Sequence, residues 1–268
     1  MKKKYISKFY KSPIIVDSID GDILLYIETN KGRELIYSGY NINKKECYIP
    51  YINKCLLGGF IKGIPKSVLI LGLGGGSYAR YLEDHINGVS ITGVDIDPIM
   101  IEISKKDMKV LSPDLICLSA EKAVSYLKGE NRKYDLILLD CYLSDGEMPN
   151  GIMYENFLRN CKDLLTSSGV LSINFSEFLL NNNYEDKKRV QRYRQMHESL
   201  KYIFGKYFSL LLVGEENGSN SMGIYNLSKF YTSKEYVDNY LECVSNSEIL
   251  FDKNIIKDTY VDKNLFLQ

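Results

Sequence analysis

The stretch from Ser67 to Pro98, SVLILGLGGGSYARYLEDHINGVSITGVDIDP, constrains the fold more than any other part of the chain. An apolar run at 68–71 leads into a cluster of glycines, and a segment with helical character follows at 78–85. A second apolar run then ends at Asp95 and Asp97. Strand, tight turn, helix and strand in this order are typical of a nucleotide-binding βαβ unit. The stretch therefore predicts half of such a unit, with a ligand loop after its first strand.

The loop contains Gly72, Gly74, Gly75 and Gly76. Glycines let the backbone turn sharply and approach a nucleoside closely, and the helix that follows presents unpaired N–H groups. Asp95 ends the next strand about 20 residues later, where a carboxylate can bind both hydroxyls of a ribose. GLGGGS lacks the last glycine of the dinucleotide fingerprint. The pattern favours an S-adenosyl ligand over NAD, while the glycines alone are also compatible with an ordinary tight turn.

The charge balance argues for small-molecule partners. Among 268 residues the chain has 34 Lys plus Arg and 34 Asp plus Glu, so its formal net charge is zero and no basic field attracts nucleic acid or membrane. The six cysteines form no CxxC pair and no cluster with histidine, so no metal site is expected. The N-terminus lacks the apolar core of a signal peptide, and no apolar run approaches a membrane span of ~20 residues. We expect a cytoplasmic protein.

From residue 67 onward, apolar runs alternate with helical segments, which predicts an α/β fold with a doubly wound, mostly parallel sheet. Two β-rich runs at 208–213 and 222–227 flank EENGSNS and predict an antiparallel hairpin at the edge of that sheet. Five parallel strands closed by such a hairpin describe the class I methyltransferase fold, which is Rossmann-like. The parallel strands are expected at 68–71, 90–94, 114–118, 136–139 and 170–174, and the helices at 78–87, 99–106, 120–127, 153–165 and 185–204.

The N-terminal part has a different pattern. Three short runs of β-forming residues within 13–38 are separated by Asp20-Gly21 and Asn30-Lys31-Gly32, which are turn formers, so a small antiparallel sheet is expected. A helix predicted over 47–60 leads from it into the main sheet. We therefore expect two domains, a small β-domain at residues 1–46 and a catalytic domain at 47–268.

Asp140 is the strongest single candidate for a functional residue. It ends the run YDLILLD, at the carboxyl end of a predicted parallel strand, where ligands bind in such sheets. A sheet core gains nothing from a desolvated charge, so the alternative is a role as a turn cap. Tyr142, Tyr51 and Tyr78 lie near the expected loops and are candidates for an acceptor pocket, and Glu177 follows the strand at 170–174.

Four motifs in order resemble the spermidine synthase family of polyamine aminopropyltransferases, in particular its divergent spermidine synthase-like members. They are SVLILGLGGGS, VDIDP, YDLILLDCY and EMPNGIMYENFLRNCKDLLTSSGVLSIN. The resemblance covers roughly residues 48–227. It implies a class I methyltransferase-like catalytic domain behind a small β-domain, and a homodimer or larger oligomer. It also implies S-adenosylmethionine or its decarboxylated form as co-substrate, and a small amine as acceptor.

Carried over position by position, the resemblance assigns Asp95 to the ribose and the glycines at 72–76 to the region of the sulfur. It assigns Asp140 to deprotonation of the attacking amine. Ser119 stands where the family usually has an aspartate that receives the adenine amino group, and a hydroxyl keeps this contact more weakly. The expected nucleoside side is completed by Ile96 and Ala120, and the acceptor side by Ser77, Tyr51, Tyr142, Asp145 and Glu177.

Two departures from the family pattern leave the reaction open. The synthases carry an aspartate after the glycine triplet that pairs with the aminopropyl ammonium, whereas this chain has Ser77, and their second catalytic aspartate is replaced by Leu143. An aspartate at position 77 would repel the carboxylate of S-adenosylmethionine by about 4 kcal/mol at ~4 Å and an effective dielectric of ~20. Its loss favours methyl transfer, whereas the resemblance favours aminopropyl transfer to putrescine. A nucleoside- or polyamine-binding module without turnover is the third alternative.

Overall fold

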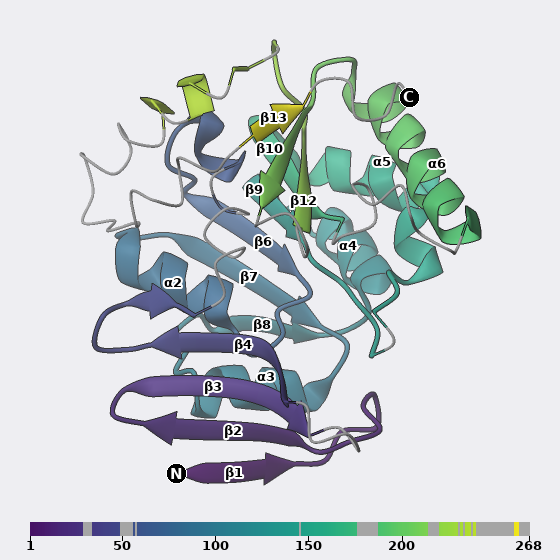
Figure 1. The fold of residues 1–268 in the computed structure, drawn as a ribbon. Helices are drawn as coiled ribbons and strands as arrows, with labels where there is room; N and C mark the ends of the chain where they lie inside the picture. Colours follow the sequence, from purple (N-terminus) through teal and green to yellow (C-terminus); the bar gives the residue numbers. More distant parts are fainter. Residues whose placement is uncertain are drawn as a thin grey trace.

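The chain folds around two β-sheets, one of five strands and one of eight, as the computed structural model shows (Figure 1). The N-terminal sheet lies beside α2 and α3, and the larger sheet forms the centre of the molecule. The structure describes residues 1–28, 34–48, 56, 58–144, 146–175, 187–213, 220–229, 231–232, 234–236, 238–239 and 260–262.

The N-terminal sheet is antiparallel throughout and its strands follow one another in chain order. Its β2–β3 turn contains Asp20 and Gly21, whose φ angles of 50° and 91° give the left-handed geometry of a type I′ hairpin. The predicted small sheet is therefore confirmed, with two additional strands, β1 and β5, that no pattern in the sequence indicated. The strands are β1 (Lys2–Tyr5), β2 (Ile14–Ile19), β3 (Asp22–Glu28), β4 (Glu34–Asn41) and β5 (Glu46–Cys47).

The larger sheet has the order β13-β11-β12-β10-β9-β6-β7-β8. Its five strands from β10 to β8 pair in parallel, and the other three are antiparallel. This confirms the predicted Rossmann-like sheet with an antiparallel hairpin, to which β13 adds an outer strand. The strands are β6 (Ser67–Leu71), β7 (Ser90–Asp95), β8 (Asp114–Cys117), β9 (Tyr134–Leu139), β10 (Leu165–Asn174), β11 (Ser209–Val213), β12 (Asn220–Tyr225) and β13 (Tyr260–Asp262).

The central strand β6 is uniformly apolar because both of its faces are buried. Val68 and Ile70 face one side of the sheet and pack in the core that includes α2 and α3. Leu69 and Leu71 face the other side and pack with α4, α5 and α6. All four side chains are 0% exposed, because helices cover both faces of a doubly wound sheet. The helices are α2 (Ser77–His85), α3 (Pro98–Lys106), α4 (Ala120–Gly129), α5 (Glu155–Leu164) and α6 (Lys187–Phe204).

One predicted helix differs from the structure. The expected helix over 47–60 begins too early, because Cys47 pairs with Tyr40 as part of β5. Most of its remaining length falls outside the described residues, although Leu56 and the residues at 58–59 are helical. None of the helices in the described part of the chain is both long and apolar enough to cross a bilayer.

Polar contacts attach the N-terminal sheet to the helices that follow the glycine loop. Tyr40 Oη in β4 donates to Asp84 Oδ2 in α2 at 2.7 Å. Tyr5 Oη in β1 donates to Asp107 Oδ2 at 2.6 Å, at the C-terminal end of α3. The same two layers share one apolar core. The N-terminal sheet is therefore held beside the end of the larger sheet at which the glycine loop follows β6.

Candidate active site

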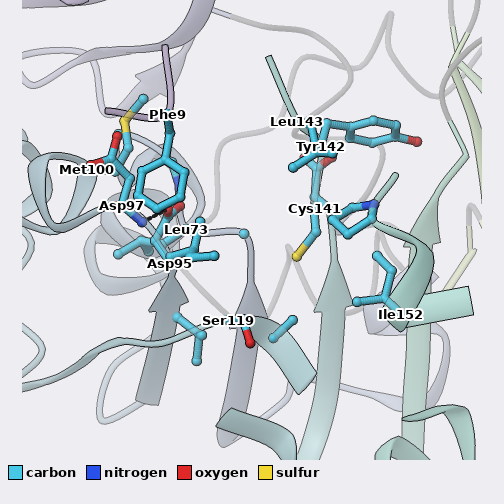
Figure 2. A pocket seen from close by; sticks show the side chains of 18 of the residues that line it. Phe9, Leu73, Asp95, Asp97, Met100, Ser119, Cys141, Tyr142, Leu143 and Ile152 are labelled. Carbon is cyan, nitrogen blue, oxygen red and sulfur yellow. Dashed lines mark hydrogen bonds between the residues drawn. The ribbon is translucent and has the colours of Figure 1, made fainter. Parts of the chain in front are cut away.

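A cavity of about 610 Å³ opens at the carboxyl ends of β6, β7 and β9. Strand β6 lies between the other two, so its glycine loop stands in the middle of the cavity wall. Asp95 is the last residue of β7 on one side, and Asp140 follows β9 on the other. Two strand spacings of ~4.8 Å separate these strand ends. Figure 2 shows Asp95 and Cys141 on opposite sides of the cavity. The two carboxylates predicted from the sequence thus border one cavity.

The first glycines of the loop are required by the backbone. Gly72 has φ of 89°, and a Cβ there would lie 2.2 Å from the carbonyl oxygen of Asp140. Its N–H donates to Val94 O at 3.0 Å, which joins the loop to β7. Gly74 has φ of 54° and open space where its Cβ would stand. The loop therefore leaves room for a ligand at Gly74 while it packs tightly on the strand end at Gly72.

The later glycines serve packing on either side of the loop. A Cβ on Gly75 would lie 2.6 Å from Leu25 Cδ2 in the N-terminal sheet. Gly76 has φ of 93°, and its Cβ would lie 3.0 Å from Ser104 Oγ in α3. Gly72, Gly74 and Gly75 line the cavity, whereas Gly76 is not among the lining residues. The structure thus brings three of the four predicted glycines to the cavity and places Gly76 against α3.

Asp95 is held in position by backbone groups of the protein itself. Its Oδ2 accepts the N–H of Gly74 at 2.8 Å, and its Oδ1 accepts the N–H of Asp97 at 2.9 Å. Each carboxylate oxygen keeps a further lone pair for a ligand hydroxyl. Burial raises the pKa of Asp95 to about 6, although these two hydrogen bonds oppose the shift. Asp95 therefore combines a fixed orientation with a titration close to neutral pH.

The role at the ribose that the sequence predicts for Asp95, combined with this raised pKa, predicts pH-dependent nucleoside binding. A ribose hydroxyl is accepted best by the ionised carboxylate, so affinity for S-adenosylhomocysteine should fall below pH ~6, approaching tenfold per pH unit. The pKa of Asp95 is about 6 in the folded state, higher than its usual value of 3.8. Between about pH 6 and pH 3.8 the folded state therefore binds a proton that the unfolded state does not, which favours folding. Unfolding caused by Asp95 does not account for a loss of affinity in this interval. Calorimetric titration from pH 5 to 8 would measure it.

The control for this measurement is Asp95→Asn, which does not titrate. Its affinity should be lower throughout and independent of pH over the same interval. A wild-type affinity that stays constant between pH 5 and 7 would contradict the assignment of Asp95 to the ribose.

Asp140 is held by side chains from two other elements. Tyr78 Oη in α2 donates to its Oδ2 at 3.2 Å, and Asn174 Nδ2 at the end of β10 donates to its Oδ1 at 2.9 Å. Tyr142 Oη donates to Asn174 O at 2.6 Å, and all four residues line the cavity. Burial raises the pKa of the neighbouring Cys141 thiol well above its usual value, so this sulfur stays protonated and forms part of the wall. The carboxylate of Asp140 is a group on this side that can accept a proton.

Two predicted serines line the cavity but also have structural partners. Ser77 is 2% exposed, and its hydroxyl pairs with Ser38 Oγ and accepts the N–H of Gly39 at 3.1 Å. Ser119 caps α4 by accepting the N–H of Lys122 at 3.4 Å. The Ser77 hydroxyl also donates to Gly39 O at 3.4 Å, so its hydrogen bonds are made within the protein, whereas the O–H of Ser119 can donate to a ligand.

Of the remaining candidate residues, two line the cavity and three lie outside the described part of the chain. Ile96, 47% exposed, and the buried Ala120 line the cavity beside Ser119. Tyr51, Asp145 and Glu177 lie outside the described residues. The cavity also has lining residues that the sequence reasoning did not name, and of these Asn174 could have been found because it ends a parallel strand next to β9. The others include Phe9, Tyr10, Ser38 and Met100.

Comparison with known proteins bears directly on this cavity. Residues 55–206, more than half of the chain, match the spermine/spermidine synthase domain. The chain belongs to the spermine/spermidine synthase family. The matched region of this family member contains the glycine loop, Asp95, Asp140 and Asn174.

Curated relatives of this family member include two kinds of transferase. It is 31% identical to the polyamine aminopropyltransferase of Vibrio vulnificus over 181 residues, which are 65% of this chain and 55% of that protein. It is 26% identical to the Neisseria meningitidis polyamine aminopropyltransferase over 167 residues, 60% of this chain and 59% of that protein. It is 30% identical to the human eEF1A lysine and N-terminal methyltransferase over 122 residues, 41% of this chain and 18% of that protein. The chain thus spans little more than half the length of these two aminopropyltransferases.

Solved structures share the fold of this family member. A probable spermidine synthase from Corynebacterium glutamicum superposes with a TM-score of 0.69 at 13% identity, covering 90% of this chain and 87% of that one. Human methyltransferase-like protein 13 in complex with SAH gives 0.59 at 20% identity, covering 76% and 96%. At such identities the likeness shows a common fold, and it confirms the class I methyltransferase-like architecture.

Proposed function

We propose that this protein transfers an alkyl group from the sulfonium sulfur of an S-adenosyl donor to the amine of a small acceptor. The observation that carries the proposal is the position of Asp95 and Asp140 on either side of the glycine loop in one cavity. Asp95 offers two oriented oxygens to a ribose, and Asp140 offers a carboxylate to an amine. A donor held between them has its sulfur beside Gly72 to Gly74.

The reaction needs few protein groups. The acceptor nitrogen forms a bond to the carbon on sulfur, the carbon–sulfur bond breaks, and its electron pair neutralises the sulfonium as a thioether. The nitrogen then releases a proton, which Asp140 accepts within hydrogen-bond reach. Tyr78 and Asn174 orient that carboxylate by the hydrogen bonds described above. Most of the rate enhancement comes from holding the two reactants in line.

The group that is transferred depends on the donor. No carboxylate among the described lining residues belongs to α2, whose first residue is the neutral Ser77. A neutral residue there accommodates the carboxylate of S-adenosylmethionine, which supports methyl transfer. The names of the curated aminopropyltransferases support transfer from the decarboxylated donor instead. We retain both, as two reactions of one site.

The identity of the nucleoside product distinguishes the alternatives. S-adenosylmethionine yields S-adenosylhomocysteine after methyl transfer, and decarboxylated S-adenosylmethionine yields methylthioadenosine after aminopropyl transfer. Each donor would be incubated with putrescine, with spermidine and with monoamines, and the products separated by mass spectrometry. Binding of a donor without either product in any mixture would favour a binding module and contradict the proposed transfer.

The Ser77→Asp variant tests which donor the site prefers. The new carboxylate should repel the amino-acid arm of S-adenosylmethionine and attract the ammonium of the decarboxylated form, which shifts the ratio of affinities by roughly tenfold or more. The hydroxyl of Ser38 and the N–H of Gly39 are beside this position and can donate to it. Ser77→Asn is the neutral control of the same shape. Equal affinity ratios in the Asp and Asn variants would show that position 77 does not face the arm.

A further inference from the structure

The loop between β1 and β2, residues 6–13, reaches the cavity at the end of the larger sheet, although β1 and β2 belong to the N-terminal sheet. Phe9 and Tyr10 in this loop line the cavity. Figure 2 shows the Phe9 ring on the side of Asp95 and Leu73, away from Cys141. We propose that Phe9 is a nucleoside-binding residue, whose ring packs against the nucleoside that Asp95 holds by its ribose. The proposal rests on the S-adenosyl transfer proposed above.

A continuous set of hydrogen bonds places Phe9 there. Ser7 is 6% exposed, and its hydroxyl donates to Asp97 Oδ2 at 2.5 Å. The N–H of Phe9 in turn donates to Ser7 Oγ at 3.0 Å. Asp97 is 2% exposed, and its Oδ1 accepts the N–H of Ile99 at 2.9 Å, which caps α3. The backbone of the loop is thus fixed to the residue that lies two positions after Asp95.

A second attachment holds the start of this segment. Lys3 Nζ and Tyr5 Oη in β1 both contact Asp107, which is at the other end of α3. The N-terminal segment therefore contacts both ends of α3, at Asp97 and at Asp107. The loop that carries Phe9 connects this segment to β2. Such a loop has little freedom to withdraw from the cavity.

The surroundings of the ring suit a flat, weakly polar ligand group. Leu73 and Met100 line the same part of the cavity and present apolar surface (Figure 2). Phe9 is half-buried and is not a member of either apolar core. Lys8 Nζ lies over its ring, 5.1 Å from the centroid, and the part of the ring that lines the cavity is left to a ligand. The purine and the carbon face of the ribose are groups of this kind. Phe9 also lies outside the matched residues 55–206, so the family match does not assign it a role.

Affinity measurements test the proposal. Adenosine, methylthioadenosine and S-adenosylhomocysteine share the nucleoside and differ in the arm, so Phe9→Ala should weaken all three by the same factor, roughly tenfold. Phe9→Leu keeps apolar volume without a flat ring and should lie between. Ile6→Ala is the matched control, because Ile6 is 71% exposed in the same loop and should leave affinity unchanged. Unchanged affinity in Phe9→Ala, or a loss limited to the ligand with the amino-acid arm, would overturn the proposal.

A fluorescence titration gives a readout that a purely structural role would not change. The chain contains no tryptophan, so Phe9→Trp introduces a single indole at the site. Adenosine should quench its emission in a saturable manner, whereas Ile6→Trp should show no saturable change. An unquenched Phe9→Trp variant that still binds adenosine would overturn the proposal.

The outcomes also separate this inference from the proposed transfer. Wild-type protein that binds none of the three nucleosides would contradict both. Wild-type protein that binds them without transferring any group would contradict the transfer alone, and the Phe9 titration would still decide the inference. A silent Phe9→Ala variant beside a weakened Asp95→Ala variant would contradict the inference alone.

Discussion

We expect the Asp140→Asn variant to turn over roughly 10²- to 10⁴-fold more slowly than the wild-type protein, the range that a positioned general base contributes. Asparagine keeps the shape of the side chain and removes its capacity to take a proton. Tyr78 and Asn174 can still hydrogen-bond to an amide at this position, because a phenol both donates and accepts. Nucleoside affinity should therefore be nearly unchanged, and the loss should appear in kcat.

Asp135→Asn is the matched control for this measurement. Asp135 belongs to the same strand, β9, but lies at its start, where Oδ2 accepts the N–H of Lys66 at 3.0 Å and of Ser67 at 3.2 Å. These bonds lower its pKa despite partial burial, so its charge serves stability at the opposite end of the sheet. The control should lower the melting temperature and leave turnover per folded molecule intact. Full activity in Asp140→Asn would contradict the role of Asp140 as proton acceptor and would leave it a role as a turn cap.

The second large effect is expected for Asp95→Ala, which should weaken S-adenosylhomocysteine binding by about 10²-fold or more. The ribose loses two charge-assisted hydrogen bonds, each contributing on the order of 1.5 to 3 kcal/mol. The fold should tolerate the change, because the freed N–H groups of Gly74 and Asp97 lie at a cavity that water can enter. Calorimetry would give the affinity, and thermal unfolding would verify the fold.

Asp114→Asn serves as the control for Asp95→Ala. Asp114 is also an acidic residue at a strand end, but it begins β8 and pairs with Arg132 at 3.0 Å, away from the cavity. Nucleoside affinity should be unaffected by this change. If Asp95→Ala bound the nucleoside as tightly as Asp114→Asn, Asp95 would not belong to the ribose site.

The parallel sheet was predictable from sequence because its strands are buried on both faces. A strand such as β6 needs apolar residues at every position, and a run of this kind between helical segments has few other interpretations. The position of Asp95 and Asp140 at the cavity was predictable for a related reason, since residues at the carboxyl ends of neighbouring parallel strands lie at one end of the sheet. Asn174 also lies at the carboxyl end of a parallel strand, and it was missed because an uncharged amide at a strand end indicates a ligand site less strongly than a carboxylate does.

Other parts depend on contacts between distant segments. Ser38 lies in a strand of the N-terminal sheet and Phe9 in a loop between two of its strands, and the sequence of this sheet indicates hairpins without indicating which surface the sheet covers. The spacing of Tyr51, Cys55 and the Leu56–Leu57 pair predicts a helix that starts at Cys47, whereas pairing with Tyr40 makes Cys47 a strand residue. Gly75 and Gly76 look equivalent to Gly74 in the sequence, and only the packing around each distinguishes them.

The packing at Gly75 also constrains how members of this family can diverge. The space that a side chain would need at this position is occupied by Leu25 Cδ2 and by Ser38 Cβ, 2.6 Å and 2.9 Å from an added Cβ. A homologue with alanine or serine at position 75 must accommodate it by a smaller residue at position 25 or a displaced strand at position 38. Substitutions at these three positions should therefore be correlated across related sequences, and a residue exchanged at position 75 alone should arise rarely and be lost quickly.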